Sequence, residues 1–420
     1  MKIHTTPNQK NVRIFAENLE ASALAQIENI AMLPSIVGDL ALMADAHTGK
    51  GVPIGTVFAT EDLVVPDVIS GDIGCGMVLM KTTRRAEELN ARSVRHLLQK
   101  VNNRVCKNIH HHGSSELTAM LPSVVDRAEP VVAKSAERAA RQLGTLGGGN
   151  HFIELQRDEE GMLWVMVHSG SRGLGQAVNG YYHDAALALC ERLGASYPQG
   201  FPYLLVDTDE GRGYLAEQAY CLRYAEANRE LLRRACEESL REEIGDFEVS
   251  LVVQTHHNFL SKERWDDRDV FVHRKGAVAA PAGAFVTIPG SMETSSFLCR
   301  GTGSALSLGS VSHGAGRAKS RGQMTPKVYL KDDNGEVFRD KGGYARVDRP
   351  ATDEARRVAA KEMILEMEAK GITLVTHDTT GVIDERAHGY KDVTHVINAQ
   401  RELLEVVTEL WPLGVVKAPN

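Results

Sequence analysis

The sequence predicts an α/β (α+β) fold, organised as a single large catalytic domain of mixed sheet and helix over residues 1–420. Apolar residues at three-to-four spacing predict amphipathic helices at about 16–31, 85–105, 124–143, 177–194, 214–243, 352–370 and 395–410. β-branched runs bounded by glycine alternate with these helices and predict strands at 63–69, 163–168, 249–255, 269–273 and 284–288. This alternation is typical of mixed sheet-and-helix architectures.

The longest predicted helix, 214–243, carries many Arg and Glu residues opposite its apolar stripe, so we expect that charged face to be solvated. No Pro- or Ser-rich linker divides the chain. The weakest seam is 332–343, where an Asn-Gly pair between β-prone stretches predicts a turn rather than a domain boundary.

Composition excludes several classes of protein. The chain has 48 Lys+Arg against 55 Asp+Glu, and the net charge of −7 argues against indiscriminate nucleic-acid binding while allowing a local basic channel. No apolar run approaches the roughly 18 residues of a membrane span, and the first residues lack a signal-peptide core. We therefore expect no membrane partner and a cytoplasmic location. The 6 cysteines include no Cys-x-x-Cys pair and are expected to be reduced.

Potential chemistry concentrates in glycine-dense segments at 45–55, 71–77, 146–154, 168–175 and 289–321, with a shorter one at 256–258. Each places a possible metal ligand within two or three residues of a glycine or beside another polar ligand. Glycine permits backbone conformations that approach a ligand closely, so such loops suit ion or phosphate sites. The 16 histidines supply the commonest transition-metal ligand.

Five side chains form a candidate metal site: Asp72, Cys75, His151, His168 and His257. The ligands adjoin predicted strands, where open α/β sheets place their ligands. Thiolate, imidazole and carboxylate together suit Zn, Mn, Fe or Co better than Mg or Ca. One ion, or two with Cys75 bridging, would fit this set. Taken singly, each position has a plainer interpretation, a buried cysteine in a tight turn or a structural histidine.

Residues 312–317 (Ser-His-Gly-Ala-Gly-Arg) predict a cradle for an anion. The small residues after His313 could offer backbone N–H groups, and Arg317 and Arg172 supply planar donors for oxyanions. In such a place His313 could ligate a metal, donate a proton or act as a phosphoryl-accepting nucleophile, and spacing does not choose among these roles. A structural turn is the simpler alternative.

Several familiar motifs are absent from the sequence: the Walker phosphate loop, the His-Glu-x-x-His zinc helix, the Gly-x-Ser-x-Gly elbow and the Lys-x-Asp-Gly lysine motif of nucleotidyltransferases. Three consecutive histidines, 110–112, lie in a polar stretch, and we expect a solvated loop there rather than a designed metal site.

Five motifs in order resemble those of the RtcB-type RNA ligases. They are Asp-Ile-Gly-Cys-Gly-Met (72–77), Gly-Asn-His-Phe-Ile-Glu (149–154), His-Ser-Gly-Ser-Arg-Gly (168–173), Pro-Gly-Ser-Met (289–292) and Ser-His-Gly-Ala-Gly-Arg (312–317). The order and spacing hold from about residue 41 to residue 417, nearly the whole chain.

The resemblance implies a reaction. Such ligases join RNA ending in a 3′-phosphate or 2′,3′-cyclic phosphate to RNA beginning with a 5′-hydroxyl, using GTP and Mn²⁺. By this resemblance His313 attacks the α-phosphorus of GTP to give a guanylyl-histidine. The guanylate then moves to the RNA 3′-phosphate, and the 5′-hydroxyl displaces GMP. A cyclic phosphate is opened first by hydrolysis. A helper protein is possible.

The resemblance also implies site residues. Asp72, Cys75 and His151 would hold one Mn²⁺, and Cys75, His168 and His257 the second. The implied nucleotide pocket comprises Asn150, His151, Phe152, Ile153, Glu154, His257, Asn258, Pro289, Gly290, Ser291, Met292, Ser296, His313, Gly314, Ala315, Gly316, Tyr390 and Lys417. The RNA phosphate would lie against Asp45, Arg172 and Arg317.

The chain departs from the family pattern in two places. Ala44-Asp45-Ala46-His47 replaces the usual Pro-Asp-Val-His, and residues 105–115 replace a Pro- and Gly-rich loop. The second departure bears on which nucleic-acid ends the protein prefers, DNA ends included. Two rival functions are a metal-dependent cyclic phosphodiesterase and a non-catalytic RNA-binding protein. Retention of His313, Glu154 and Lys417 favours the ligase, and retention of all five metal ligands argues against a non-catalytic protein.

Overall fold

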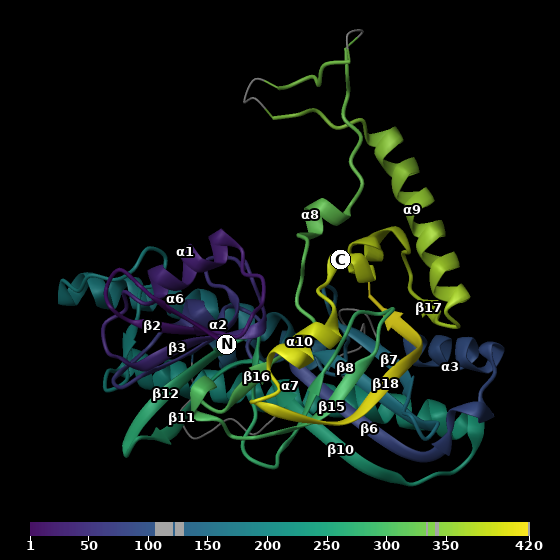
Figure 1. Ribbon diagram of the computed structural model, residues 1–420, viewed down its shortest axis with the longest axis horizontal. Helices are drawn as coiled ribbons and strands as arrows, with labels where there is room; N and C mark the ends of the chain where they lie inside the picture. The colour runs from purple at the N-terminus through teal and green to yellow at the C-terminus, as the bar shows by residue number, and fades with distance from the viewer. Residues whose placement is uncertain (106–120, 122–129, 333–334, 341–343, 419–420) are drawn as a thin grey trace.

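Two large β-sheets organise the fold in the computed structural model, which describes residues 1–105, 121, 130–332, 335–340 and 344–418 (Figure 1). The first sheet lies on the left of the view and has the strand order β1-β2-β3-β4-β12-β11. Its strands are β1 (Lys2–Thr5), β2 (Asn11–Ile14), β3 (Ile36–His47), β4 (Ile54–Thr60), β11 (Asn258–Trp265) and β12 (Arg268–Lys275).

The second sheet has the order β10-β6-β8-β7-β18-β15-β14, and β17 adds in parallel to β18. Its strands are β6 (Gly76–Arg85), β7 (Phe152–Arg157), β8 (Met162–Ser169), β10 (Val249–His256), β14 (Phe285–Ile288), β15 (Ser296–Gly301), β17 (Thr373–Val375) and β18 (Leu404–Lys417). Two short pairs complete the strands: β5 (Leu63–Val64) with β9 (Leu204–Leu205), and β13 (Ala277–Ala279) with β16 (Ser310–Ser312). The mixed sheet-and-helix class predicted from the sequence is confirmed.

Helices cover the sheets. They are α1 (Ala21–Ile30), α2 (Pro66–Ile69), α3 (Ala91–Arg104), α5 (Pro130–Gln142), α6 (Arg172–Leu193), α7 (Asp209–Ile244), α8 (Arg321–Met324), α9 (Arg349–Ala369) and α10 (Val393–Ala399). Short 3₁₀ turns lie at Ala86–Glu88, Ala305–Ser307, Thr380–Glu385 and Ala387–Gly389. None of the helices in the described ranges is long and apolar enough to cross a membrane.

Helix α7 is the longest of the described helices, and its ends show why it begins and ends where it does. The Thr208 hydroxyl accepts a hydrogen bond from the Gly211 N–H, and two acidic residues occupy the first turn. At the other end, Gly245 adopts a φ of 79° and stops the helix. One side of α7 packs on α6 and β9, and another packs on α3, β6 and β8. The helix therefore contributes to the cores under both sheets.

Three sequence predictions need correction. Residues 63–69 form a two-residue strand and then α2, because Pro66 occupies the first helical turn, where its missing N–H costs nothing. The predicted helix 395–410 ends at Ala399, and β18 follows from Leu404. Here β-branched Val406, Val407 and Thr408 favour a strand. The face of α7 expected to be solvated is partly buried.

Three features of the sequence fall wholly or partly on residues outside the described ranges. They are the histidines at 110–112, all but the first residue of the departure at 105–115, and residues 124–129 of one predicted helix. The Asn-Gly turn is described only from Gly335. Around it, Lys331 pairs with Val337 in an antiparallel bridge, as a turn between two β-prone stretches requires.

Strand register gathers the candidate metal ligands at one edge of the second sheet. Gly76 opens β6 and pairs with Ser169 at the end of β8 and with His256 at the end of β10. Phe152 opens β7 and pairs with His168. These strands are antiparallel, so the start of one strand meets the end of the next. Antiparallel pairing, rather than the carboxyl ends of a parallel sheet, therefore brings the candidate ligands together.

Candidate metal centre and nucleotide pocket

Three side chains meet in a buried cluster beside Gly76. The Cys75 Sγ lies 3.4 Å from Nε2 of His151 and 3.1 Å from Nε2 of His168. The Nε2 of His257 lies 3.4 Å from Nε2 of His168. Ligand atoms of Cys75, His151 and His168 all lie within 4.8 Å of one another, which is the spacing of a metal site.

Backbone carbonyls fix the tautomers of two of these imidazoles. Nδ1 of His151 lies 3.0 Å from the Leu146 carbonyl, and Nδ1 of His168 lies 3.1 Å from the Asn150 carbonyl. Each Nδ1–H therefore donates to its carbonyl, and each Nε2 directs a lone pair at the Cys75 sulfur. The single proton of the Cys75 thiol can be donated to only one of these two nitrogens, so the other lone pair gains a partner only when a cation is bound. The donor set therefore fits a transition metal ion.

Burial sets the protonation of the cluster. It lowers the pKa of His151 to about 3 and the pKa values of His168 and His257 well below their usual value, so all three rings are neutral at pH 7. Burial and the neighbouring Asp72 carboxylate raise the pKa of the Cys75 thiol well above its usual value. A bound cation would reverse that second shift, because a coordinated thiol is deprotonated.

Asp72, which is expected to hold one ion together with Cys75 and His151, lies at the rim of the cluster. Its Oδ2 is 4.0 Å from Nε2 of His151, and its side chain is 41% exposed. It lines the adjoining cavity together with His168 and His257. The structure thus brings all five predicted ligands to one place, with the carboxylate facing the cavity.

His313 lies next to His257 at the side of the cluster and beside a buried carboxylate. Its Nδ1 lies 2.6 Å from Oδ2 of Asp45, which is fully buried in β3. Its ring packs edge-on against His257, with centroids 4.9 Å apart. The contact does not have the geometry of a hydrogen bond, but it places Nδ1 against the carboxylate, so Nε2 is the ring nitrogen on the other side. Asp45 is thus placed beside the ring, and its contact with an RNA phosphate stays a prediction.

The anion cradle predicted after His313 has fewer free backbone N–H groups than expected. The Ala315 N–H donates to the Pro289 carbonyl at 2.9 Å, so it is not free for a phosphate. The carbonyl of Gly316 accepts from the Lys391 N–H. Gly314, Ala315 and Gly316 nevertheless line the cavity, which lets a ligand approach the backbone closely.

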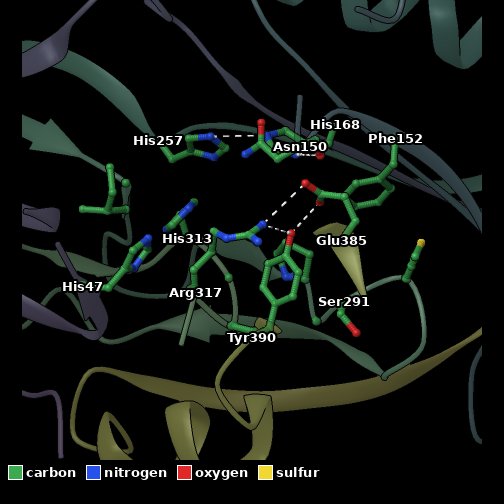
Figure 2. A pocket seen from close by; sticks show the side chains of 18 of the residues that line it. His47, Asn150, Phe152, His168, His257, Ser291, His313, Arg317, Glu385 and Tyr390 are labelled. Carbon is green, nitrogen blue, oxygen red and sulfur yellow. Dashed lines mark hydrogen bonds and ion pairs between the residues drawn. The ribbon is translucent and has the colours of Figure 1, made fainter. Parts of the chain in front are cut away.

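A network of charged side chains forms the opposite end of the cavity (Figure 2). His168 and His257 lie at the top of the view, and below them dashed lines join Glu385 to Arg317 and to Tyr390. The Glu385 carboxylate accepts from the Tyr390 hydroxyl at 2.5 Å and pairs with Arg317 at 3.5 Å and Lys417 at 3.4 Å.

Positive neighbours outweigh burial in setting the charge of Glu385. Burial alone would raise its pKa, but Lys417 and Arg321, with help from Tyr390 and Arg317, lower it to about 2. The Lys417 ammonium also donates to the carbonyls of Gly149 and His151. The network is therefore fully charged and already paired at neutral pH.

Glu154 has the opposite electrostatic environment. It is buried, and burial raises its pKa to about 8 in spite of a hydrogen bond from the Gln156 amide. The same amide lies 3.2 Å from the Ser296 hydroxyl, which in turn accepts from the Gly290 N–H. Glu154 is therefore mostly protonated at pH 7, and its acid group remains open to a ligand with suitable donors.

Arg172 packs over the loop that carries His151. It adopts a left-handed φ of 57°, and its Nε donates to the Thr145 hydroxyl at 3.1 Å. A Cβ at Gly147 would fall 1.7 Å from its Nη1, so only glycine allows this approach. Arg172 thus lies next to the metal cluster, within reach of an anion bound there.

Comparison with known proteins decides the family. The family model described as "tRNA-splicing ligase RtcB" matches residues 26–129, 123–355 and 349–418. The chain belongs to the RtcB family. It is 32% identical to "RNA-splicing ligase RtcB" of Escherichia coli K12 over 95% of each chain. It is 29% identical to "tRNA-splicing ligase RtcB" of Nanoarchaeum equitans, covering 97% of this chain and 95% of that one. It is 28% identical to "RNA-splicing ligase RtcB" of Mycobacterium tuberculosis, covering 93% of this chain and all of that one.

The cavity brings together most of the nucleotide-pocket residues expected for an RtcB protein. Those lining it are Asn150, Phe152, His257, Asn258, Pro289, Gly290, Ser291, Met292, His313, Gly314, Ala315, Gly316, Tyr390 and Lys417. His151, Ile153, Glu154 and Ser296 are buried and do not line the cavity, and Ile153 packs instead in the core that includes Val101 and Leu240. Of the three expected phosphate contacts, Arg317 lines the cavity, whereas Asp45 and Arg172 stand behind it.

Several charged residues of this RtcB site escaped the sequence analysis. Lys275, Arg321 and Glu385 line the cavity, and Arg229 is buried behind the metal cluster. Arg229 lies in the predicted helix 214–243, and Lys275 lies two residues beyond the predicted strand 269–273, at the end of β12. Arg321 follows the Ser-His-Gly-Ala-Gly-Arg motif, and Glu385 precedes Tyr390. Neither residue belongs to a recognisable motif of its own. Only the Asp-Glu pair before Tyr390 could have suggested a partner for Lys417.

Proposed function

We propose that this chain is an RNA ligase that uses GTP and Mn²⁺ to join RNA 3′-phosphate or 2′,3′-cyclic-phosphate ends to 5′-hydroxyl ends. Support comes from family membership, since relatives over the full length are named RNA-splicing or tRNA-splicing ligases. The single observation that carries the chemistry is His313, oriented by Asp45 at 2.6 Å and facing the cluster of Cys75 and histidines. Because residues from Asp45 to Lys417 build one site, the proposal treats the chain as one catalytic unit.

In this proposal Nε2 of His313 forms a bond to the α-phosphorus of GTP, and pyrophosphate leaves. The Asp45 carboxylate holds the ring in the required orientation and stabilises the positive charge that develops on it. The guanylate then passes to a 3′-phosphate oxygen of RNA, which frees the ring. Finally the 5′-hydroxyl oxygen bonds to that 3′-phosphorus, and GMP leaves with its proton.

The metal ligands divide into two sets in this proposal. Asp72, Cys75 and His151 would hold one Mn²⁺, and Cys75, His168 and His257 the other. When bound, the ions would supply Lewis-acid stabilisation of phosphoryl oxygens. The chain's own contribution is the arrangement of neutral imidazole lone pairs around one sulfur, which needs no reorganisation on binding.

The guanine end of the nucleotide would lie near Lys417, Glu154 and Tyr390. Lys417 is buried and anchored to two carbonyls, so its third N–H, which faces Glu385, is the donor that would turn to a guanine acceptor. The Glu154 carboxyl would accept from guanine N–H groups once ionised, which a paired ligand favours. Arg317 and Arg172 would contact the RNA phosphate.

Labelling with α-³²P-GTP tests the proposal. With Mn²⁺ present, we expect an acid-labile, alkali-stable protein adduct that disappears in His313→Ala. His183→Gln is the matched control, because His183 pairs with Asp67 at the surface, away from the cavity. Opening of a cyclic phosphate without any adduct would favour the phosphodiesterase instead.

A further inference from the structure

One buried arginine contacts the neighbours of three metal ligands. Arg229 on α7 is fully buried, and its Nη1 donates to the Gly74 carbonyl at 2.8 Å and to the Ser169 carbonyl at 3.0 Å. Its Nη2 lies 3.2 Å from Nδ1 of His256. Gly74, Ser169 and His256 each directly adjoin a ligand in sequence: Cys75, His168 and His257.

The fourth contact sets the direction of the guanidinium. Nε of Arg229 donates to Oε1 of Gln254 at 2.9 Å, on strand β10. Nε2 of His256 lies 2.9 Å from Oε1 of Glu226, and its Nδ1 lies between Arg229 at 3.2 Å and the Gly74 carbonyl at 3.1 Å. The planar fork thus connects α7, the loop before β6, the end of β8 and the end of β10.

Close packing against α7 fixes the position of the Gly74 loop relative to Arg229. Gly74 has a φ of 73°, and a Cβ there would lie 3.0 Å from Cβ of Ala225 on α7. The loop therefore rests directly on the helix. Its carbonyl points at Arg229, and the His257 N–H donates to the next carbonyl, that of Cys75, at 2.8 Å.

The preceding residue on the helix serves a different loop. The Asn228 side-chain oxygen accepts from the N–H groups of Gly144 and Thr145, and its amide donates to the Thr145 carbonyl and the Ser169 hydroxyl. This loop continues to Leu146, the carbonyl of which orients His151. Asn228 therefore supports the His151 side of the cluster, and Arg229 supports the other side.

We propose that Arg229 is a positioning residue for one of the two ions: it holds Cys75, His168 and His257 in the arrangement that binds the second Mn²⁺. This inference rests on the proposed two-ion site. Arg229 touches neither ion nor substrate, and it acts through three carbonyl and imidazole contacts on the ligand-bearing strands and loop. Outer contacts of this kind typically change metal affinity by roughly 10- to 100-fold.

Calorimetric titration with Mn²⁺ and metal counting by mass spectrometry test this role. The wild-type chain is expected to bind two Mn²⁺ per chain. Arg229→Lys, which keeps the charge but not the fork, should retain the first ion and bind the second roughly 10- to 100-fold more weakly. The electron paramagnetic resonance signal of a coupled Mn pair should be replaced by that of an isolated ion.

Arg233→Lys is the matched control, one turn along the same helix. The Arg233 guanidinium bonds Glu230 and Glu237 of α7 itself, so this variant should bind both ions as the wild type does. If Arg229→Lys fails to fold, Gln254→Ala decides, because it removes the Nε acceptor at an exposed position and should weaken the same ion severalfold.

The outcomes separate the two proposals. Unchanged affinity for both ions in Arg229→Lys, or in Gln254→Ala if that variant is the one used, overturns the role of Arg229 and leaves the ligase proposal intact. A wild-type chain that binds no Mn²⁺ overturns the two-ion site itself, and with it the ligase proposal.

Discussion

The two ends of the cavity differ in charge: one is lined by neutral metal-ligating groups and the other by paired ions. The metal cluster consists of neutral imidazoles and a thiol, with lone pairs that face one another. The network around Glu385 instead holds full charges that are already paired with Lys417, Arg317 and Arg321. In the first region, the ligand lone pairs would gain partners only from an added cation. In the second region, every charge already has a partner in the absence of a ligand. Variants at the two ends should therefore fail in different ways.

The largest effect is expected at the metal end. Cys75→Ala removes the one ligand shared by both proposed ions and should reduce ligation by roughly 100-fold or more. Without metal, stability should change by only roughly 1 kcal/mol, because the variant loses one weak S–H···N hydrogen bond. Metal counting and a ligation assay on 3′-phosphate RNA check this. Full metal occupancy in Cys75→Ala would contradict the bridging thiolate.

The next effect is expected at the charged end, and it concerns folding. Glu385→Gln leaves buried Lys417 and half-buried Arg317 without their anion and should lower the free energy of unfolding by about 3 kcal/mol. Chemical denaturation at pH 7 measures it. Unlike Cys75→Ala, this variant should be destabilised in the absence of both metal and nucleotide.

Acid titration sharpens the same contrast. The pKa of Glu385 is lowered from 4.5 to about 2 in the folded chain, so its stabilising contribution is present above pH 4.5. That contribution is lost as the pH falls toward 2. The wild type should therefore lose more stability than Glu385→Gln between pH 5 and pH 2, and parallel curves for the two proteins would contradict the pairing.

At Glu154 we expect a change in stability of opposite sign and of at most the same size. Its pKa is raised from 4.5 to about 8, so the folded state loses stability as the pH rises through this range. Glu154→Gln should stabilise the nucleotide-free protein by up to about 3 kcal/mol at pH 7, while raising the KM for GTP. Thermal melting with and without GTP measures both. A destabilised variant would show that the carboxyl is not strained by burial.

The smallest effect is expected from an ion pair outside both regions. Arg95 on α3 and Glu368 on α9 lie 3.0 Å apart, and each side chain is 48% exposed. Solvent screening limits such pairs, so Arg95→Ala should change stability by less than about 1 kcal/mol. A larger loss in denaturation would mean that charge pairing alone, without burial, accounts for the effect at Glu385.

The sequence predicts the ligands better than what surrounds them. Cys75, His151, His168 and His257 could be identified because glycine loops and strand ends mark them. Arg229 could not, because its signature on α7 is that of any charged helix residue, and only the packing of Gly74 on the helix shows that it is buried. The periodicity of apolar residues predicted the fold class. It failed at 63–69, where Pro66 begins a helix instead of continuing a strand, and at 406–408, where β-branched residues form a strand instead of a helix.

His257 occupies a position with a mechanical consequence. It is the single residue between β10, which belongs to one large sheet, and β11, which belongs to the other. An ion held by His257 and by the loop before β6 would restrain the point where the chain passes from one sheet to the other. A cation at 100 times its dissociation constant would add about 2.7 kcal/mol to the folded state. Metal loading should therefore slow amide exchange in strands of both sheets, far from the cluster itself.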